Sequence, residues 1–257
     1  MGLATQIAYS SLLAFFPAVA FLLGLLGLVH LYDEVKSLIG SVAPQGVLNF
    51  VEGLQKDSRG SASVVAFVVG FAGALWAASG AAGTVIKAVN RAYGCPETRP
   101  FWKLRLIAVL LVVLTALTTA ATLVLIVFGA PLGSAIANKA GLGSVWNVSW
   151  AILRWPVTLA ALLTFFALVY YLAPNIELRE WKWITPGAVI GSLCWLALSA
   201  LFALYATFSG SYSRTYGTLA AGVILLLWLN YTSWAILFGA ELNAAIRRLQ
   251  VRPSASP

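Results

Sequence analysis

Apolar residues fill six long stretches of the chain, and short polar segments separate these stretches. Each is about 20 to 30 residues long, which is enough for a helix to cross the hydrocarbon core of a bilayer. The pattern therefore predicts an all-α fold, a polytopic membrane helical bundle with six transmembrane helices. The expected spans cover residues 3–29, 62–83, 106–130, 148–173, 184–208 and 217–245.

Local signals predict where two of these helices begin or end. The second helix should continue past the bilayer, through Lys87 and Asn90, and stop at Gly94. Thr185 followed by Pro186 is typical of a helix start, with a capping side chain and then a proline in the first turn. Small residues in the second stretch, and a Gly187–Gly191 pair in the fifth, favour close helix packing.

The segment 30–61 lies between the first two spans and has mixed character. Its apolar residues recur at helical spacing on both sides of Pro44. It is either a pair of amphipathic helices on the outer membrane surface or a plain packed loop. The remaining expectations are a single transmembrane domain over residues 1–250 and a disordered polar tail over 251–257.

The composition excludes an ordinary soluble domain, because 61% of the residues are hydrophobic and only 9% are charged. A soluble chain of this length could not bury so much apolar surface in one core. The two cysteines, Cys95 and Cys194, should lie at different depths, so we expect no disulfide between them.

The net charge of +8 comes from 16 basic and 8 acidic residues. Nucleic-acid binding could explain such a balance, but so could the enrichment of Lys and Arg in cytoplasmic loops, which we favour. The loops on one side of the membrane hold ten basic residues and those on the other side hold five, with Arg154 within a span, which predicts that both termini lie in the cytoplasm. The inner ten are Lys87, Arg91, Arg99, Lys103, Arg105, Arg179, Lys182, Arg247, Arg248 and Arg252; the outer five are Lys36, Lys56, Arg59, Lys139 and Arg214.

Soluble-enzyme motifs are absent from the sequence, which has no phosphate-binding loop, no HExxH and no paired CxxC. The one histidine, His30, has no second metal ligand near it in the sequence. We therefore expect a protein that is not an enzyme, with no catalytic residues, no bound metal and no cofactor.

Charged and amide side chains within the spans are the best candidates for function, because they are expensive at membrane depth. Arg154 lies about six residues, or roughly 9 Å, into the fourth span. Glu241 lies at a similar depth from the other side. Either residue could gate a polar path, or could instead reach the membrane surface or pair with a nearby group. Asn230, near the middle of the last span, and Asn175, at the end of the fourth, complete the candidate path.

The segment between the last two spans is a candidate outer binding surface. It combines Arg214 with the hydroxyl-bearing Tyr212 and Tyr216. The arginine could bind an anionic headgroup or solute. The alternative is a tight, well-capped turn.

Four strings resemble the YihY/BrkB family of bacterial inner-membrane proteins, formerly mislabelled ribonuclease BN. They are IAYSSLLAFFP, NRAYGCPETRPFWKLRL, ALVYYLAPN and the stretch from PGAVIGSLCW to SGSYSRTYGTLAAGVILLLWLNYTSWAILFGAELN. The resemblance implies six transmembrane helices in the cytoplasmic membrane of a bacterium. The family has no agreed biochemical function, although transport of ions or lipid-like molecules has been proposed for it.

Two functions remain open from the sequence. The first is a transporter or permease-like protein for a small ion or lipid-like substrate. The second is a non-catalytic membrane protein that binds partners or lipids in envelope organisation. A polar cavity at mid-membrane would favour the first, and a solid bundle with a lipid-filled lateral groove would favour the second or lipid translocation. In both, membrane lipids are the expected partners and nucleic acid is not; the oligomeric state is open.

Overall fold

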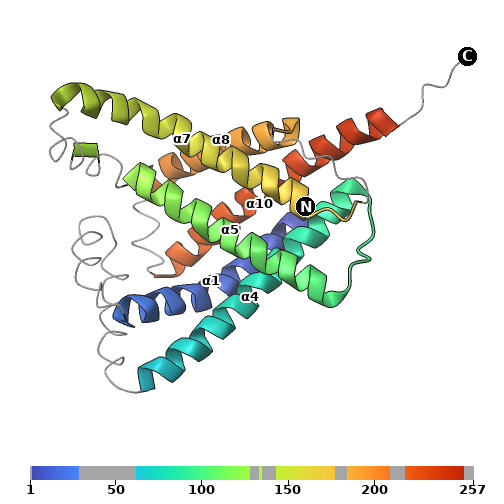
Figure 1. The fold of residues 1–257 in the computed structure, drawn as a ribbon, viewed down its shortest axis with the longest axis horizontal. Coiled ribbons are helices and arrows are strands. Elements are labelled where there is room, and N and C mark those ends of the chain that lie inside the picture. Colours follow the sequence, from blue (N-terminus) through green and yellow to red (C-terminus); the bar gives the residue numbers. More distant parts are fainter. Residues whose placement is uncertain are drawn as a thin grey trace, which may run out of the picture.

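The computed structural model describes residues 2–28, 62–127, 133–134, 143–176, 184–208 and 218–251. This part of the chain contains six long helices and no strand (Figure 1). The predicted outer segment 30–61 and the tail residues 252–257 lie outside the described residues. The helices are α1 (Gly2–Leu28), α4 (Ala62–Tyr93), α5 (Phe101–Val127), α7 (Gly143–Leu172), α8 (Pro186–Phe208) and α10 (Thr218–Val251).

Each of the six predicted spans coincides with one helix, so the predicted all-α membrane bundle is confirmed. Among the described residues, five helices are long and apolar enough to cross a membrane. The sixth, α1, has 27 residues and contains no charged residue. Helices α4 and α10 continue beyond the predicted spans at their C-terminal ends, to Tyr93 and Val251.

The predicted stop of α4 at Gly94 is confirmed by its backbone geometry. Gly94 has a φ of 70°, a left-handed conformation that glycine adopts without steric cost. Its N–H donates to the carbonyl of Arg91 at 3.1 Å, and the N–H of Cys95 donates to that of Asn90 at 3.0 Å. These two bonds form a Schellman motif, which satisfies carbonyls that the helix end would otherwise leave unpaired.

Helices that follow one another along the chain also pack side by side. Contacts join α1 to α4, α4 to α5, α5 to α7, α7 to α8 and α8 to α10, and α10 completes the ring by packing on α1 and α4. The start of α1 and the end of α10 lie at the same end of the bundle (Figure 1). Consecutive helices therefore run in alternating directions, as expected of short connections between spans.

The buried core lies at the end of the bundle where α4 and α7 finish and α8 begins. It is made of residues such as Ile86, Val89, Phe166 and Ala188, all fully or almost fully buried. Large apolar side chains elsewhere, among them Leu117 and Ile152, are well exposed and would face lipid. A bundle dissolved in a bilayer presents such apolar side chains on its outside, because lipid tails are as apolar as they are.

Glycines allow α8 and α10 to meet almost backbone to backbone beside Tyr170. A Cβ added at Gly187 would overlap the carbonyl oxygen of Gly239, and one added at Gly239 would overlap the hydroxyl of Tyr170. That hydroxyl is buried and donates to the carbonyl of Ile236 at 2.8 Å. The predicted close packing at the fifth span is confirmed at Gly187 and Gly191.

The small residues of α4 behave differently. Ala74, Ala81 and Ala82 are buried, whereas a Cβ added at Gly73 or Gly80 would meet no atom within 4 Å. Alanines rather than glycines therefore make the close contacts of this helix.

Replacing Gly239 with alanine should destabilise the bundle, because the new methyl group would displace Tyr170 or separate α8 from α10. We expect a loss of about 1–3 kcal/mol, the usual effect of overpacking, measured as unfolding of the purified protein in detergent. The matched control is Gly222→Ala on the same helix, where an added Cβ meets open space. Equal stability of the two variants would contradict the packing role of Gly239.

Candidate functional site

Polar side chains tie the α4–α5 connection to the end of α7. Arg99, in that connection, donates to the carbonyls of Leu172 at 3.2 Å and Ala173 at 2.8 Å. Carbonyls at the end of a helix have no partner within the helix, so the arginine satisfies them from outside. Glu97 forms an ion pair with the same guanidinium, whose side chain is only 6% exposed. The connection is therefore held in a fixed place against α7.

Two asparagines extend this junction. The Nδ2 of Asn90 donates to Glu97 at 2.7 Å, and its Oδ1 accepts the backbone N–H of Asn175 at 2.7 Å. The Nδ2 of Asn175 in turn donates to the carbonyl of Pro96 at 2.9 Å and to the hydroxyl of Thr98 at 2.8 Å. Asn175, a candidate for the polar path, thus lies in a network that joins α4, α7 and their neighbouring connections.

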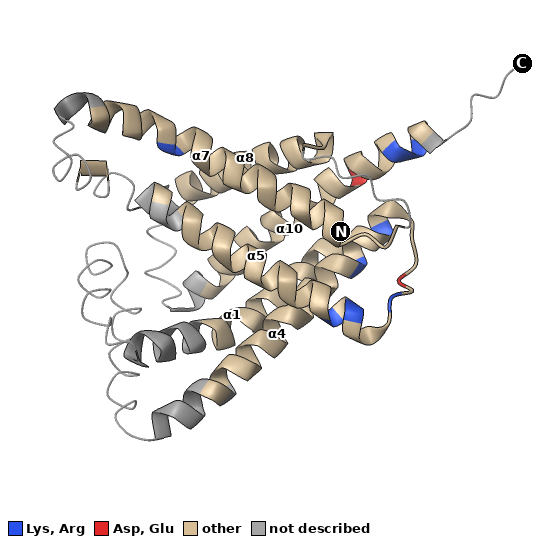
Figure 2. Ribbon diagram, in the orientation of Figure 1, with Lys and Arg blue, Asp and Glu red and all other residues tan. Residues whose placement is uncertain are grey.

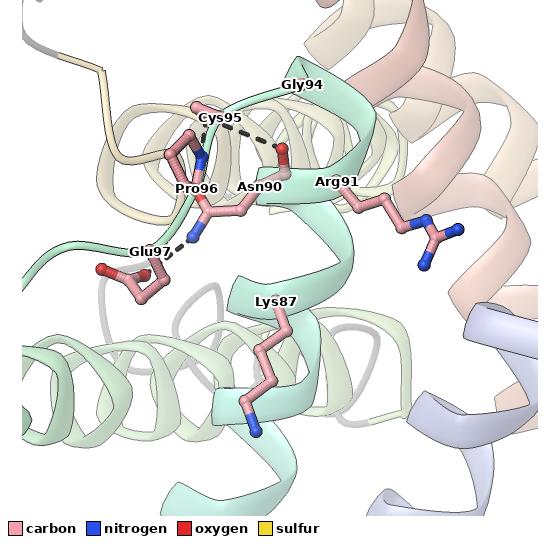
Figure 3. A pocket seen from close by; sticks show the side chains of 7 residues that line it. All are labelled: Lys87, Asn90, Arg91, Gly94, Cys95, Pro96 and Glu97. Carbon is pink, nitrogen blue, oxygen red and sulfur yellow. Dashed lines mark hydrogen bonds between the residues drawn. The ribbon is translucent and has the colours of Figure 1, made fainter.

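Beside this junction lies an open depression of about 510 Å³. Figure 3 shows Asn90 bonded to Glu97 and Cys95, while Lys87 and Arg91 extend away from these contacts. Because Glu97 is already paired with Arg99, the two other cations give the depression a positive rim. Its lining residues are Lys87, Asn90, Arg91, Gly94, Cys95, Pro96 and Glu97.

The start of α8 is fixed by a residue on α10. The hydroxyl of Thr185 accepts the N–H of Ala188 at 3.2 Å, which confirms Thr185 as the predicted cap. Asn243 adds a second cap from another helix: its Oδ1 accepts the N–H of Gly187 at 2.8 Å, and its Nδ2 donates to Thr185 at 3.0 Å. Asn243 was not singled out from the sequence, where its signal was an amide side chain near the end of the last helix.

Arg154 lies within the membrane-spanning part of α7, and the structure gives it an unusual environment. Its Nε is buried and has no hydrogen-bond partner. The guanidinium carbon lies 5.5 Å from the ring centroid of Trp155. Arg154 is the one basic residue of α7 and lies in its first half, whereas the other charged residues drawn in Figure 2 gather toward the end of the bundle where α4 and α10 finish.

The other three candidate path residues lie apart from Arg154. Glu241 is exposed on α10 and forms no ion pair with a described residue. Asn230 donates to the hydroxyl of Thr5 on α1 at 3.4 Å, a bond between two helices. Within the described residues, no contact joins any two of Arg154, Glu241, Asn230 and Asn175, and their roles in a path stay predictions.

The candidate outer surface with Tyr212, Arg214 and Tyr216 lies outside the described residues. Among those that are described, no three His, Cys, Asp or Glu side chains gather as metal ligands would. The expectation of a protein that is not an enzyme stays a prediction.

Glu97 should make stability depend on pH. Hydrogen bonds from Arg99 lower the pKa of this carboxyl below its ordinary value of 4.5. The group therefore adds stability above that pH, and the contribution is lost as the pH falls through the lowered pKa. We expect Glu97→Gln to lower the thermal midpoint at pH 7 by about 2–4 °C and to flatten its decline between pH 6 and pH 3.

The matched control for this experiment is Glu241→Gln, which removes an exposed carboxylate from the same end of the bundle. It should keep the wild-type dependence of the thermal midpoint on pH. A Glu97→Gln protein with the wild-type acid decline would show that the junction does not use the ionised carboxylate.

Comparisons with known proteins place the chain in a family. A model of the family described as "Virulence factor BrkB" matches residues 1–257. The ribonuclease-like protein YfkH of Bacillus subtilis is 30% identical over 253 residues, which cover 98% of this chain and 92% of the relative. The membrane protein IL2447 of Idiomarina loihiensis is 37% identical over 99 residues, covering 38% of this chain and 34% of that protein.

A Vibrio cholerae membrane protein, VCM66_2662, is 36% identical over 112 residues, which are 43% of this chain and 36% of that relative. No solved structure shows significant similarity to the chain. The family match extends over the same six helices whose packing and junction are described above. The chain belongs to the BrkB family of multi-pass membrane proteins.

Proposed function

We propose that the protein is a transporter of an anionic, lipid-like molecule, and that Arg154 binds the anionic part. The observation that carries this proposal is the buried Nε of Arg154, which has no hydrogen-bond partner. In this function the protein catalyses no covalent step.

A cation within a membrane span is costly unless an anion or hydrogen-bond acceptors compensate it. Among the described residues the acidic side chains are Glu97 and Glu241, and both lie at the opposite end of the bundle from Arg154 (Figure 2). An arginine that merely reached for water would keep its polar atoms solvated. The shielded Nε of Arg154 does not meet this condition, and the half-buried side chain leaves its terminal nitrogens within reach of an anion.

The surroundings of Arg154 favour an amphipathic anion. Its neighbours on α7 are apolar and exposed: Ile152 is 66% exposed, Leu153 51% and Trp155 56%. These side chains would face acyl chains in a bilayer. A molecule that approaches Arg154 from this side must be compatible with hydrocarbon, as a lipid is and a free hydrated ion is not.

The arrangement of the helices supports a route for such a molecule. The buried core lies at one end, and α4 and α7 begin far apart at the other end (Figure 1). Among the described residues, the basic side chains gather at the end with the buried core (Figure 2), which supports a cytoplasmic position for that end and for both termini. In the proposed function the protein lies in the cytoplasmic membrane, with Arg154 in the outer half.

The second candidate function is that of a membrane protein that binds lipid but transports no substrate. An apolar groove of about 490 Å³ between α8 and α10 favours it, because such a groove fits an acyl chain. It is lined by Ser199, Phe202, Ala203, Ile224, Leu225 and Trp228.

Flux in sealed proteoliposomes separates the two functions. The vesicles should contain labelled phosphatidylglycerol or phosphatidylcholine, with sodium and proton fluxes measured in parallel. We expect wild-type protein to move the anionic lipid between leaflets, and Arg154→Gln to slow this about tenfold or more, the effect of losing roughly 1.4 kcal/mol of binding. Arg154→Lys should retain part of the activity because it retains the charge.

The matched control is Arg247→Gln, which removes a basic residue at the other end of the bundle and should leave the flux unchanged. Flux that is equal for wild type and a folded Arg154→Gln variant would contradict the assigned role of Arg154. Absence of any flux with folded wild-type protein would overturn transport and favour the lipid-binding candidate.

A further inference from the structure

The first two turns of α5 and the middle of α4 form a surface that the proposed transport route does not use. Four large apolar side chains are exposed on it: Trp76 is 67% exposed, Phe101 58%, Trp102 80% and Leu106 69%. Arg105 lies among them on α5, whereas Lys103, two residues earlier, lies on another side of that helix. We call Trp76, Phe101, Trp102, Arg105 and Leu106 the α4–α5 face.

Arg105 is held in place by α4. Its guanidinium carbon lies 3.9 Å from the ring centroid of Trp76, within the range of a cation–π contact. Its Nη2 donates to the carbonyl of Trp76 at 3.1 Å. An arginine has five N–H donors, so this one bond leaves most of the guanidinium able to bind an acceptor. Stacking and hydrogen bonding fix its orientation before any ligand arrives.

The positive charge of this face has no counter-charge among the described residues. The carboxylate of Glu97 is paired with Arg99. Glu241 lies on α10, away from the α4–α5 face. Arg105 therefore has no described carboxylate to balance its charge beside the exposed aromatic rings.

This combination of groups matches one class of ligand. Tryptophan side chains favour the boundary between headgroups and acyl chains, and clustered Lys and Arg bind anionic headgroups there. The face lies at the end of the bundle where the basic residues gather (Figure 2). A free phosphate would use the cation but not the four exposed apolar side chains.

We infer that the α4–α5 face is a binding site for one anionic phospholipid, whose phosphate contacts Arg105 and whose glycerol and acyl regions lie against Trp76 and Trp102. This site is separate from Arg154, and the inference does not depend on whether the protein transports anything. The inference assigns one bound lipid to the contact between α4 and α5. Within the described residues, no ion pair joins these two helices.

The test uses the purified full chain in neutral detergent, titrated with phosphatidylglycerol, phosphatidylcholine or inorganic phosphate. Retained lipid is measured by native mass spectrometry, and the thermal midpoint is measured in the same samples. We expect phosphatidylglycerol to bind and to raise the midpoint, and the other two probes to do neither. Arg105→Gln should weaken phosphatidylglycerol binding about tenfold or more, because it removes a charged hydrogen-bond donor. Arg105→Lys should weaken it less.

The matched control is Arg91→Gln, which removes an exposed arginine from the same end of α4 but not from this face. It should change binding less than about twofold if the site is local, since distant exposed charges are screened by salt. Trp102→Ala keeps the test decisive if Arg105→Gln does not fold, because an 80% exposed ring adds little to packing. We expect it to weaken phosphatidylglycerol binding severalfold.

Three results would overturn the inference. Equal losses in Arg91→Gln and Arg105→Gln would show diffuse attraction to the whole basic end. Stabilisation of the wild type by phosphate alone would show a simple anion site. Unchanged binding in Trp102→Ala and Arg105→Lys would show that neither the ring nor the guanidinium geometry contributes.

Discussion

The close approach of α8 and α10 beside Tyr170 is the contact on which the rest of the bundle depends. In lipid no hydrophobic force draws apolar helices together, so small residues and interhelical hydrogen bonds must do so. Gly187 and Gly239 let the two backbones meet, and Tyr170 fills the remaining space while its hydroxyl satisfies the carbonyl of Ile236. Asn243 then joins α10 to the first N–H groups of α8. Three helices are thereby fixed at one end of the molecule.

The polar junction around Arg99 extends this rigid end to α4. The last carbonyl groups of a helix have no partner within the helix. At the end of α7, the side chain of Arg99 satisfies two such carbonyls, although it lies more than 70 residues earlier in the sequence. Arg248 on α10 similarly donates to the carbonyl of Ala92 near the end of α4 at 2.7 Å. Basic residues at this end thus have a structural role. Counting them in loops predicted an orientation in the membrane but could not predict this role.

The sequence predicted what depends on neighbouring residues and missed what depends on distant ones. Span positions follow from length and apolarity, and the stop at Gly94 follows from one residue's backbone freedom. The partners of Asn175 could not be predicted, because they come from a connection nearly 80 residues away. Glycine content also could not predict which helices pack closely. Glycine makes a close contact at Gly187 and none at Gly73. The difference depends on which face of each helix meets a neighbour, and only the folded bundle determines that.

Arg154 and Arg105 share a chemistry that bears on the identity of the ligand. Each is an arginine beside a tryptophan, with the guanidinium carbon 5.5 Å from the Trp155 ring in one case and 3.9 Å from the Trp76 ring in the other. Both lie among exposed apolar side chains, and no described carboxylate pairs with either. They sit toward opposite ends of the bundle (Figure 2). A ligand that binds in both environments needs a compact anionic group attached to a hydrocarbon chain. Membrane phospholipids supply this combination in either leaflet, whereas hydrated ions do not.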